Sequence, residues 1–315
     1  MLRYLTQRTL ASLAVLFVIV SCTFFLIKLA PGGLSILTSP EMDPEVVARI
    51  TANLGLDQPA HVQYMRWLSS VVKGDLGQSL IYNRPVLTMV MERLPATLLL
   101  TGSALLVAII VSIPCGILSA RHQHSWIDQA LSFISFLGLA IPGFWLGILL
   151  VLLFAVKLRW LPAAGMMTAG QEFSWIDRAR HLVIPTIVLA VPSMAELMRF
   201  TRSTWIDLQH QDFVRVGRAK GLSEFAIQYR HILKNALIPI VTVIGLFLPR
   251  LAGGAAIIET LFSWPGMGSL AIDAATNRDA PLILGVTIIV SITVILSNLL
   301  VDLTYPLLDP RLKRR

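Results

Sequence analysis

The chain has 315 residues, of which 55% are hydrophobic and only 14% are charged, and its formal net charge is +8. Soluble globular domains carry about 25% charged residues, so this composition excludes an ordinary soluble enzyme or binding module. It indicates an integral membrane protein whose basic residues set orientation beside apolar spans, and nucleic-acid binding is not expected.

The first predicted span is the uncharged run 10–27, which follows Arg3 and Arg8. This run is close to the ~20 residues that cross a membrane. No small-residue cleavage site follows before Lys28, so we expect a retained anchor and not a cleaved signal peptide. Residues 1–30 are therefore assigned to the N-terminus and the first transmembrane helix.

Residues 31–95 are predicted to form an external helical segment. Apolar residues repeat at helical spacing over 46–54 and 62–72, and each repeat ends before a glycine. Tyr64 and Trp67 are expected to act as interfacial anchors. The segment either caps the helix ends or forms a ledge on which an external partner docks.

Five further spans are expected within a core of residues 96–304. They are placed at 96–120, 129–156, 182–199, 235–258 and 280–302. With the first span they predict an all-α membrane protein of six transmembrane helices.

Two of these spans contain ionisable residues, Glu196 and Arg250. Such a group costs about 2.5–3.5 kcal/mol at mid-membrane and normally faces a cavity or a partner. Arg250 is a candidate pathway residue, with a structural ion pair as the alternative. Glu196 is a weaker pathway candidate, because Arg199 and Arg202 lie near it and favour a local ion pair.

A third place in the spans has the composition of a pathway lining. Pro142 interrupts the 129–156 run and two aromatic residues follow it, Phe144 and Trp145. Proline inside a membrane helix frees backbone groups that neighbouring helices or a cavity must satisfy. We therefore include both aromatic residues among the candidates for the translocation pathway.

Lysine and arginine predict the orientation. In the six-span model one side collects most of the basic residues, including those of loop 200–234 and of the tail 305–315. That side is expected to be cytoplasmic, with both termini inside. The residues on it are Arg3, Arg8, Arg121, Arg199, Arg202, Arg215, Arg218, Lys220, Arg230, Lys234, Arg311, Lys313, Arg314 and Arg315.

Loop 200–234 has the pattern of two short helices joined at an elbow. Residues from Thr204 to Lys220 favour a helix, Gly221 permits a sharp turn, and Ser223 can cap a second helix that runs through Leu233. The loop also has more apolar residues than a freely solvated linker. It is therefore predicted to press into another protein, with these apolar residues available for contact: Phe213, Val214, Ala219, Leu222 and Phe225.

The same loop resembles a known motif. Its segment Arg215-Val-Gly-Arg-Ala-Lys-Gly221 is similar to the "EAA" loop of ABC importer permeases, E-A-A-x3-G-x9-I-x-L-P, with Gly221 and Leu233 in register. The departures are Arg215-Val216-Gly217 in place of Glu-Ala-Ala, His231 in place of Ile and Lys234 in place of Pro. They resemble the dipeptide, oligopeptide and nickel branch of that family.

The resemblance extends along the chain, through 54–59, 74–79, 84–86, 259–268, 301–303 and 308–311. It implies a type I ABC importer permease fold with a cytoplasmic coupling helix. The residues that it assigns to coupling with an ATPase are Arg215, Gly217, Arg218, Ala219, Lys220, Gly221, Leu222, Ser223 and Glu224.

Resemblance to this family also implies partners. These are a homologous second permease subunit, two ABC ATPase subunits and an external solute-binding protein, assembled in a bacterial inner membrane. The chain contains no Gly-Lys dipeptide and hence no phosphate-binding loop, so ATP and magnesium are expected in the partner ATPases. No catalytic residue, cofactor or metal site is assigned to this chain, and His122 with His124 are read as solvated or docking residues.

The predicted function is import of di- and oligopeptides by alternating access, coupled to the ATPases through the loop around Gly221. Nickel or a metal chelate, glutathione and opines remain alternative cargoes for the same machinery. A self-sufficient secondary transporter is the alternative of a different class, and it would be expected to show an internal repeat, which is not evident here.

Overall fold

The computed structural model describes residues 2–29 and 57–308, with side chains placed at 6–29, 57–247 and 255–302. Within these residues the backbone is helical apart from turns and a single bridge between Gln78 and Pro85. The all-α prediction is confirmed. The chain divides into two compact units, which are described separately below.

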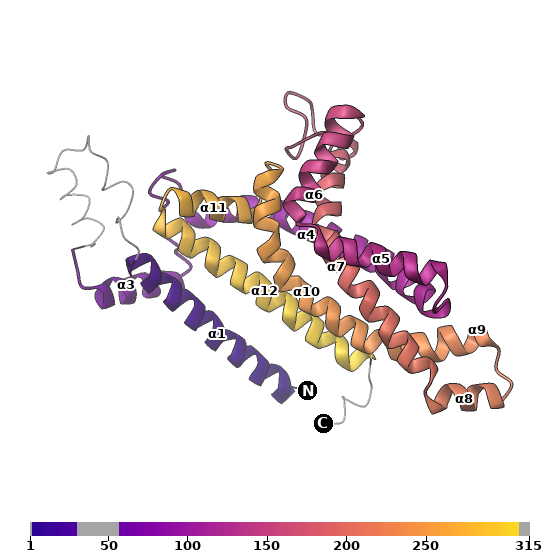
Figure 1. The fold of residues 1–315 in the computed structure, drawn as a ribbon. Coiled ribbons are helices and arrows are strands. Elements are labelled where there is room, and N and C mark those ends of the chain that lie inside the picture. Colours follow the sequence, from indigo (N-terminus) through magenta and orange to yellow (C-terminus); the bar gives the residue numbers. More distant parts are fainter. Residues whose placement is uncertain (1, 30–56, 309–315) are drawn as a thin grey trace. The chain divides into compact units, whose positions relative to one another are not determined.

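The described elements follow one another along the chain as labelled in Figure 1. They are α1 (Leu2–Leu29), α3 (Ala60–Val72), α4 (Val86–Arg121), α5 (Trp126–Ala140), α6 (Gly143–Leu150), the π-helix η2 (Val151–Lys157), α7 (Trp175–Gln209), α8 (Asp212–Ala219), α9 (Glu224–Ala226), the π-helix η3 (Ile227–Ile232), α10 (Leu233–Leu261), α11 (Met267–Thr276) and α12 (Ala280–Leu308).

Among the described residues, five helices are long and apolar enough to cross a membrane: α1, α4, α7, the helix that runs from α9 into α10, and α12. The sixth predicted span is a bent pair, in which α5 and the α6–η2 helix meet at 103°. The bend falls at Ile141 and Pro142, both of which have extended ψ values. Proline lacks an N–H and disfavours helix at the residue before it, so the span breaks there.

Several helices are longer than the predicted spans. The α4 helix starts at Val86 instead of residue 96, inside the stretch assigned to the external segment, and α7 covers Trp175–Gln209 instead of 182–199. Charged residues ended the predicted spans, but they do not end the helices. Glu92, for example, is exposed on α4 and accepts a 2.6 Å hydrogen bond from Arg84. The helices therefore continue beyond their apolar parts.

One compact unit comprises residues 2–96 and 265–295. Its apolar core joins α1, α4, α11 and α12, and Gly285 of α12 lies so close to Val86 of α4 that a Cβ on the glycine would meet that side chain at 2.2 Å. The buried Asp279 carboxylate caps α12 and also accepts hydrogen bonds from Ser79 and Ile81.

The α3 helix coincides with the second of the two helices predicted in residues 31–95, and its external location stays a prediction. Tyr64 and Trp67 pack against Phe24 of α1, and the Tyr64 hydroxyl shares a 2.6 Å hydrogen bond with Ser21. Both aromatic residues therefore attach α3 to α1, and their predicted role as interfacial anchors stays a prediction. The first external helix, predicted over 46–54, lies outside the described residues.

The other unit comprises residues 97–264 and 296 onward. In it α7 packs against α5, α6 and α10. Small residues allow close contact between α4 and α7, because a Cβ on Gly116 would lie 2.7 Å from both the Met198 carbonyl oxygen and the Thr201 side chain.

Small polar residues along α4 reach the neighbouring helices. Ser103 and Ser112 bond to Thr186 and the Met194 carbonyl oxygen of α7, and Thr97 donates to the buried Glu259 carboxylate of α10 at 2.7 Å. Such hydrogen bonds stabilise helix pairs where lipid offers no alternative partner.

Candidate coupling site

The first half of the predicted coupling loop is the helix α8, which ends in a Schellman motif. The N–H of Gly221 donates to the Arg218 carbonyl oxygen at 2.9 Å, and the N–H of Leu222 donates to the Gly217 carbonyl oxygen at 3.2 Å. Gly221 has a φ of +75°, the left-handed conformation that this motif requires. The predicted elbow at Gly221 is confirmed, and its hydrogen bonds make it a fixed turn.

The second half begins at Ser223, whose hydroxyl accepts a hydrogen bond from the Ala226 N–H at 3.3 Å. The predicted helix cap is confirmed. From Glu224 the chain stays helical through α9 and η3 and runs directly into α10. The coupling segment, which we define as residues 212–232, is therefore a direct extension of a membrane-spanning helix.

An ion pair closes the elbow. Arg218 of α8 donates from Nε to Glu224 Oε1 at 2.7 Å and from Nη2 to Oε2 at 3.3 Å. The hydrogen bond from Arg218 to Glu224 raises the pKa of the Arg218 guanidinium above its ordinary value. Because both side chains are more than half exposed, the pair orients the two helices without adding much stability.

The coupling segment has both buried and exposed apolar residues. Val214, Gly217, Ile227 and Ile232 are buried, where α8 packs against η3. Other large apolar residues of the segment are exposed to solvent. These are Phe213, Val216, Leu222, Phe225 and Tyr229. Figure 1 shows the segment beyond the end of α7.

The entry to the segment differs from the prediction. The sequence favoured one helix from Thr204 to Lys220, but α7 ends at Gln209 and α8 starts afresh at Asp212. Gln211 between them has an extended ψ of 153° and serves as the first residue before α8. The break turns α8 away from the α7 axis. Arg215 and Lys220, both assigned to coupling, are exposed on α8 and its end.

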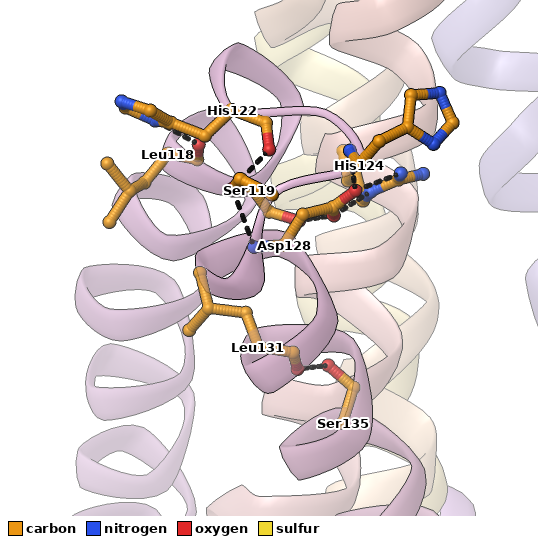
Figure 2. Close-up of polar contacts among 9 residues, drawn as sticks. Leu118, Ser119, His122, His124, Asp128, Leu131 and Ser135 are labelled. Carbon is orange, nitrogen blue, oxygen red and sulfur yellow. Dashed lines mark hydrogen bonds and ion pairs between the residues drawn. The ribbon is translucent and has the colours of Figure 1, made fainter.

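A second polar cluster lies at the same end of α7, centred on Asp128 of α5 (Figure 2). Arg202 of α7 binds the Asp128 carboxylate side-on, from Nε at 2.7 Å and from Nη2 at 2.8 Å. The Ser119 hydroxyl of α4 donates to Oδ1 at 2.6 Å, and the His124 N–H donates to Oδ2 at 3.0 Å. One buried carboxylate therefore joins α4, α5 and α7.

Two arginines of α7 contact side chains of α5: Arg202 binds Asp128, and Arg199 lies over the Phe136 ring at 4.8 Å. The local ion pair that the sequence favoured for Glu196 stays a prediction. Glu196 itself is half-buried on α7.

The other pathway candidates lie elsewhere. Phe144 and Trp145 are exposed at the start of α6, just after the Pro142 break. Arg250 belongs to α10, and its side chain lies outside the described part of the chain.

Sequence reasoning missed Asp128, although a local pattern marks it. The four residues Ser-Trp-Ile-Asp occur twice, at 125–128 and at 174–177, and each time they start a helix with serine as the N-cap. Serine followed three residues later by an acid, before an apolar run, is a helix-start pattern. The pattern identifies both helix starts but gives no information about the partner of the acid.

In the second copy of the pattern, the acid Asp177 binds the loop that precedes α7. Asp177 accepts hydrogen bonds from the N–H and the hydroxyl of Thr168, both at 2.7 Å. The buried His181 ring, one turn further on, bonds to the Gly165 carbonyl oxygen at 3.1 Å. The two acids therefore perform related tasks at the starts of α5 and α7, each tying its helix to a neighbouring segment.

His122 and His124 lie in the turn between α4 and α5. In Figure 2 the rings of His122 and His124 point to different sides, and the His122 Nδ1 atom lies 3.0 Å from the Leu118 carbonyl oxygen. Across the described residues, no three His, Cys, Asp or Glu side chains come together as metal ligands.

Comparison with known proteins identifies the family of this chain. Residues 112–314 match the family model of the binding-protein-dependent transport system inner membrane component, and residues 1–101 match the model of the N-terminal region of such membrane components. The chain belongs to this family. It is accordingly a permease component of an ABC transport system and is not itself a catalytic enzyme.

Similarity to named permeases extends over the full length. The oligopeptide transport system permease protein AppB of Bacillus subtilis (strain 168) is 40% identical over 315 residues, which cover 99% of this chain and all of that protein. A protein of Brucella suis biovar 1 named as a peptide permease is 40% identical over 322 residues, covering 99% of each.

A solved structure supports the fold of the permease. The inward-facing MetNI methionine ABC transporter matches with a TM-score of 0.58 and 16% identity, over 70% of this chain and 96% of the compared chain. The predicted type I importer permease fold agrees with this match.

Proposed function

We propose that this permease conducts small peptides inward through an ATP-driven importer. The 40% identity to an oligopeptide permease carries this proposal, because the similarity covers 99% of this chain and all of that protein. Exposed Phe144 and Trp145 beside the Pro142 break would then line the pathway with Arg250 and Glu196, which supply a positive and a negative charge within α10 and α7.

The coupling segment is the proposed contact with an ATPase subunit. Its exposed apolar residues form the kind of surface that soluble monomers avoid and that a partner protein covers. The Schellman turn at Gly221 and the Arg218–Glu224 pair hold α8 at a fixed angle to α10. A displacement of the docked segment therefore passes into α10 as a lever motion instead of being absorbed in the loop.

The remaining assembly follows from family membership. A second, homologous permease subunit, two ATPase subunits and an external solute-binding protein would complete the importer, and ATP with magnesium would bind in the ATPases. The protein would lie in a bacterial inner membrane with both termini and the coupling segment on the cytoplasmic side, and residues 31–95 outside. The basic residues of the coupling segment and of the C-terminal tail support this orientation.

Cargo is tested with the solute-binding protein that accompanies this permease. Liposomes holding the complete complex are supplied with a labelled tripeptide or with nickel ions, each with the binding protein outside and ATP inside. ATP-dependent uptake of the peptide, competed by unlabelled peptide and not by nickel, is expected. Uptake of nickel alone, or uptake by this chain alone under an ion gradient, would contradict the proposal.

A further inference from the structure

The Asp128 cluster has a position that the coupling role of residues 212–232 does not explain. Arg202 lies seven residues before the end of α7, and the helix is uninterrupted between them, a distance of about 10 Å. The prolines inside α7, Pro185 and Pro192, both come before Arg202. A displacement that enters α7 at its C-terminal end therefore reaches Arg202 before it reaches the prolines, where the helix is weaker.

At Arg202 the displacement meets a rigid contact. The Asp128 side chain is only 7% exposed, and both its oxygens accept two hydrogen bonds each, one of them from the guanidinium. Side-on pairing of arginine with a carboxylate is directional as well as strong. The Ser119 and His124 donors fix the carboxylate from the other side, so the Arg202 guanidinium cannot move without Asp128.

Asp128 passes the displacement to the bent span. It occupies the first turn of α5, and α5 runs without a break to Ala140, just before the bend at Pro142. Beyond the bend lie Phe144 and Trp145 of α6. One ion pair therefore links the helix next to the coupling segment with the helix that leads to the proposed pathway aromatics.

We propose that Asp128 and Arg202 are positioning residues for transport. Their ion pair makes α5 move together with the last part of α7, from Arg202 to Gln209, when the coupling segment is displaced. This inference rests on the proposed function of the coupling segment. As positioning residues, the two would act through α5 and α7 and not by binding cargo or nucleotide. Loss of the pair should lower the amount of peptide transported per ATP hydrolysed. Loss of a residue that only maintains the fold would leave this ratio unchanged.

The test uses the complete importer in liposomes with Asp128→Asn, Arg202→Gln and Ser119→Ala variants. The amount of assembled complex is measured by size-exclusion chromatography, and the peptide uptake rate is divided by the rate of ATP hydrolysis. We expect this ratio to fall about tenfold for Asp128→Asn and Arg202→Gln, and by a smaller factor for Ser119→Ala, which keeps the ion pair.

Arg84→Gln is the matched control. It removes an arginine–carboxylate contact of similar length, 2.6 Å to Glu92, from the other compact unit. Its ratio should equal that of the wild type. If Asp128→Asn and Arg202→Gln lower uptake and ATP hydrolysis in the same proportion, the pair is only structural and the inference is wrong.

A distance measurement separates this inference from the cargo assignment. Spin labels are placed at exposed Trp126 on α5 and exposed Asp207 on α7, in a complex without native cysteines. Pulsed EPR distances are then compared between the nucleotide-free and ATP-trapped complexes. We expect one unchanged distance in the wild type and a shifted or broadened distribution with Arg202→Gln. If the Arg202→Gln complex shows the same unchanged distance as the wild type, the inference is wrong, whatever the cargo is.

Discussion

Two glycines of the coupling segment, Gly217 and Gly221, differ in backbone conformation and in the space around them. Gly217 is helical, and a Cβ placed on it would meet the Ile227 side chain at 3.5 Å, an ordinary van der Waals distance. Gly221 has open space around it but a φ of +75°. Space therefore permits a side chain at both positions, whereas backbone conformation permits it only at Gly217.

Alanine substitutions at the two positions should have opposite effects. Gly217→Ala should stabilise α8 by roughly 0.5–1 kcal/mol and keep transport at the wild-type level. Gly221→Ala should strain the elbow by about 1–2 kcal/mol and lower ATP-coupled uptake by roughly 5–30-fold. Uptake by reconstituted complexes measures the effect of each substitution on transport.

Gly170→Ala controls for strain alone. Gly170 also has a left-handed φ, +77°, and empty space around it, but it lies outside the coupling segment. Its uptake should match that of the wild type. If Gly170→Ala and Gly221→Ala lowered uptake equally, strain and not coupling would explain the result.

Elements of the coupling segment were largely predictable, because local chemistry determines them. The positive-φ glycine and the capping serine specify a turn and a helix start whatever the surroundings. The helix ends and the Asp128–Arg202 pair were not predictable. Asp128 and Arg202 are 74 residues apart, and only the packing of α5 on α7 brings them together.

The exposed apolar residues of the coupling segment predict a binding contact. Phe225 is 72% exposed, and its ring lies against that of Tyr229 at 4.5 Å between ring centroids. Aromatic residues of this kind are common binding hot spots, and loss of one costs more than about 1 kcal/mol. Phe225→Ala should therefore weaken binding of the ATPase about fivefold or more in a pull-down titration, with no change in the melting temperature of the isolated permease.

Trp175→Ala is the matched substitution at the start of α7. Trp175 is also 72% exposed and contacts one neighbouring ring, that of Phe173, at 4.8 Å. ATPase binding by this variant should be unchanged. Equal loss of binding in both variants would mean that the coupling segment is not the contact.

At the scale of the whole molecule, the proposed orientation places the two ends of α7 on opposite sides of the membrane. Basic residues gather in the coupling segment and the tail, and such residues remain in the cytoplasm. A cysteine at position 225 should then be protected from a membrane-impermeant maleimide in intact cells, and one at 175 should react. Cys22 and Cys115 are replaced first. The reverse pattern would invert the proposed topology.

The coupling segment is proposed to convert ATP hydrolysis by partner subunits into motion of this permease. Gly221→Pro tests it most directly, because proline fixes φ near −65° and removes the N–H that bonds to the Arg218 carbonyl oxygen. In liposomes, the variant complex should remain assembled and hydrolyse ATP while peptide uptake falls to background. Uptake at the wild-type rate would contradict the claim.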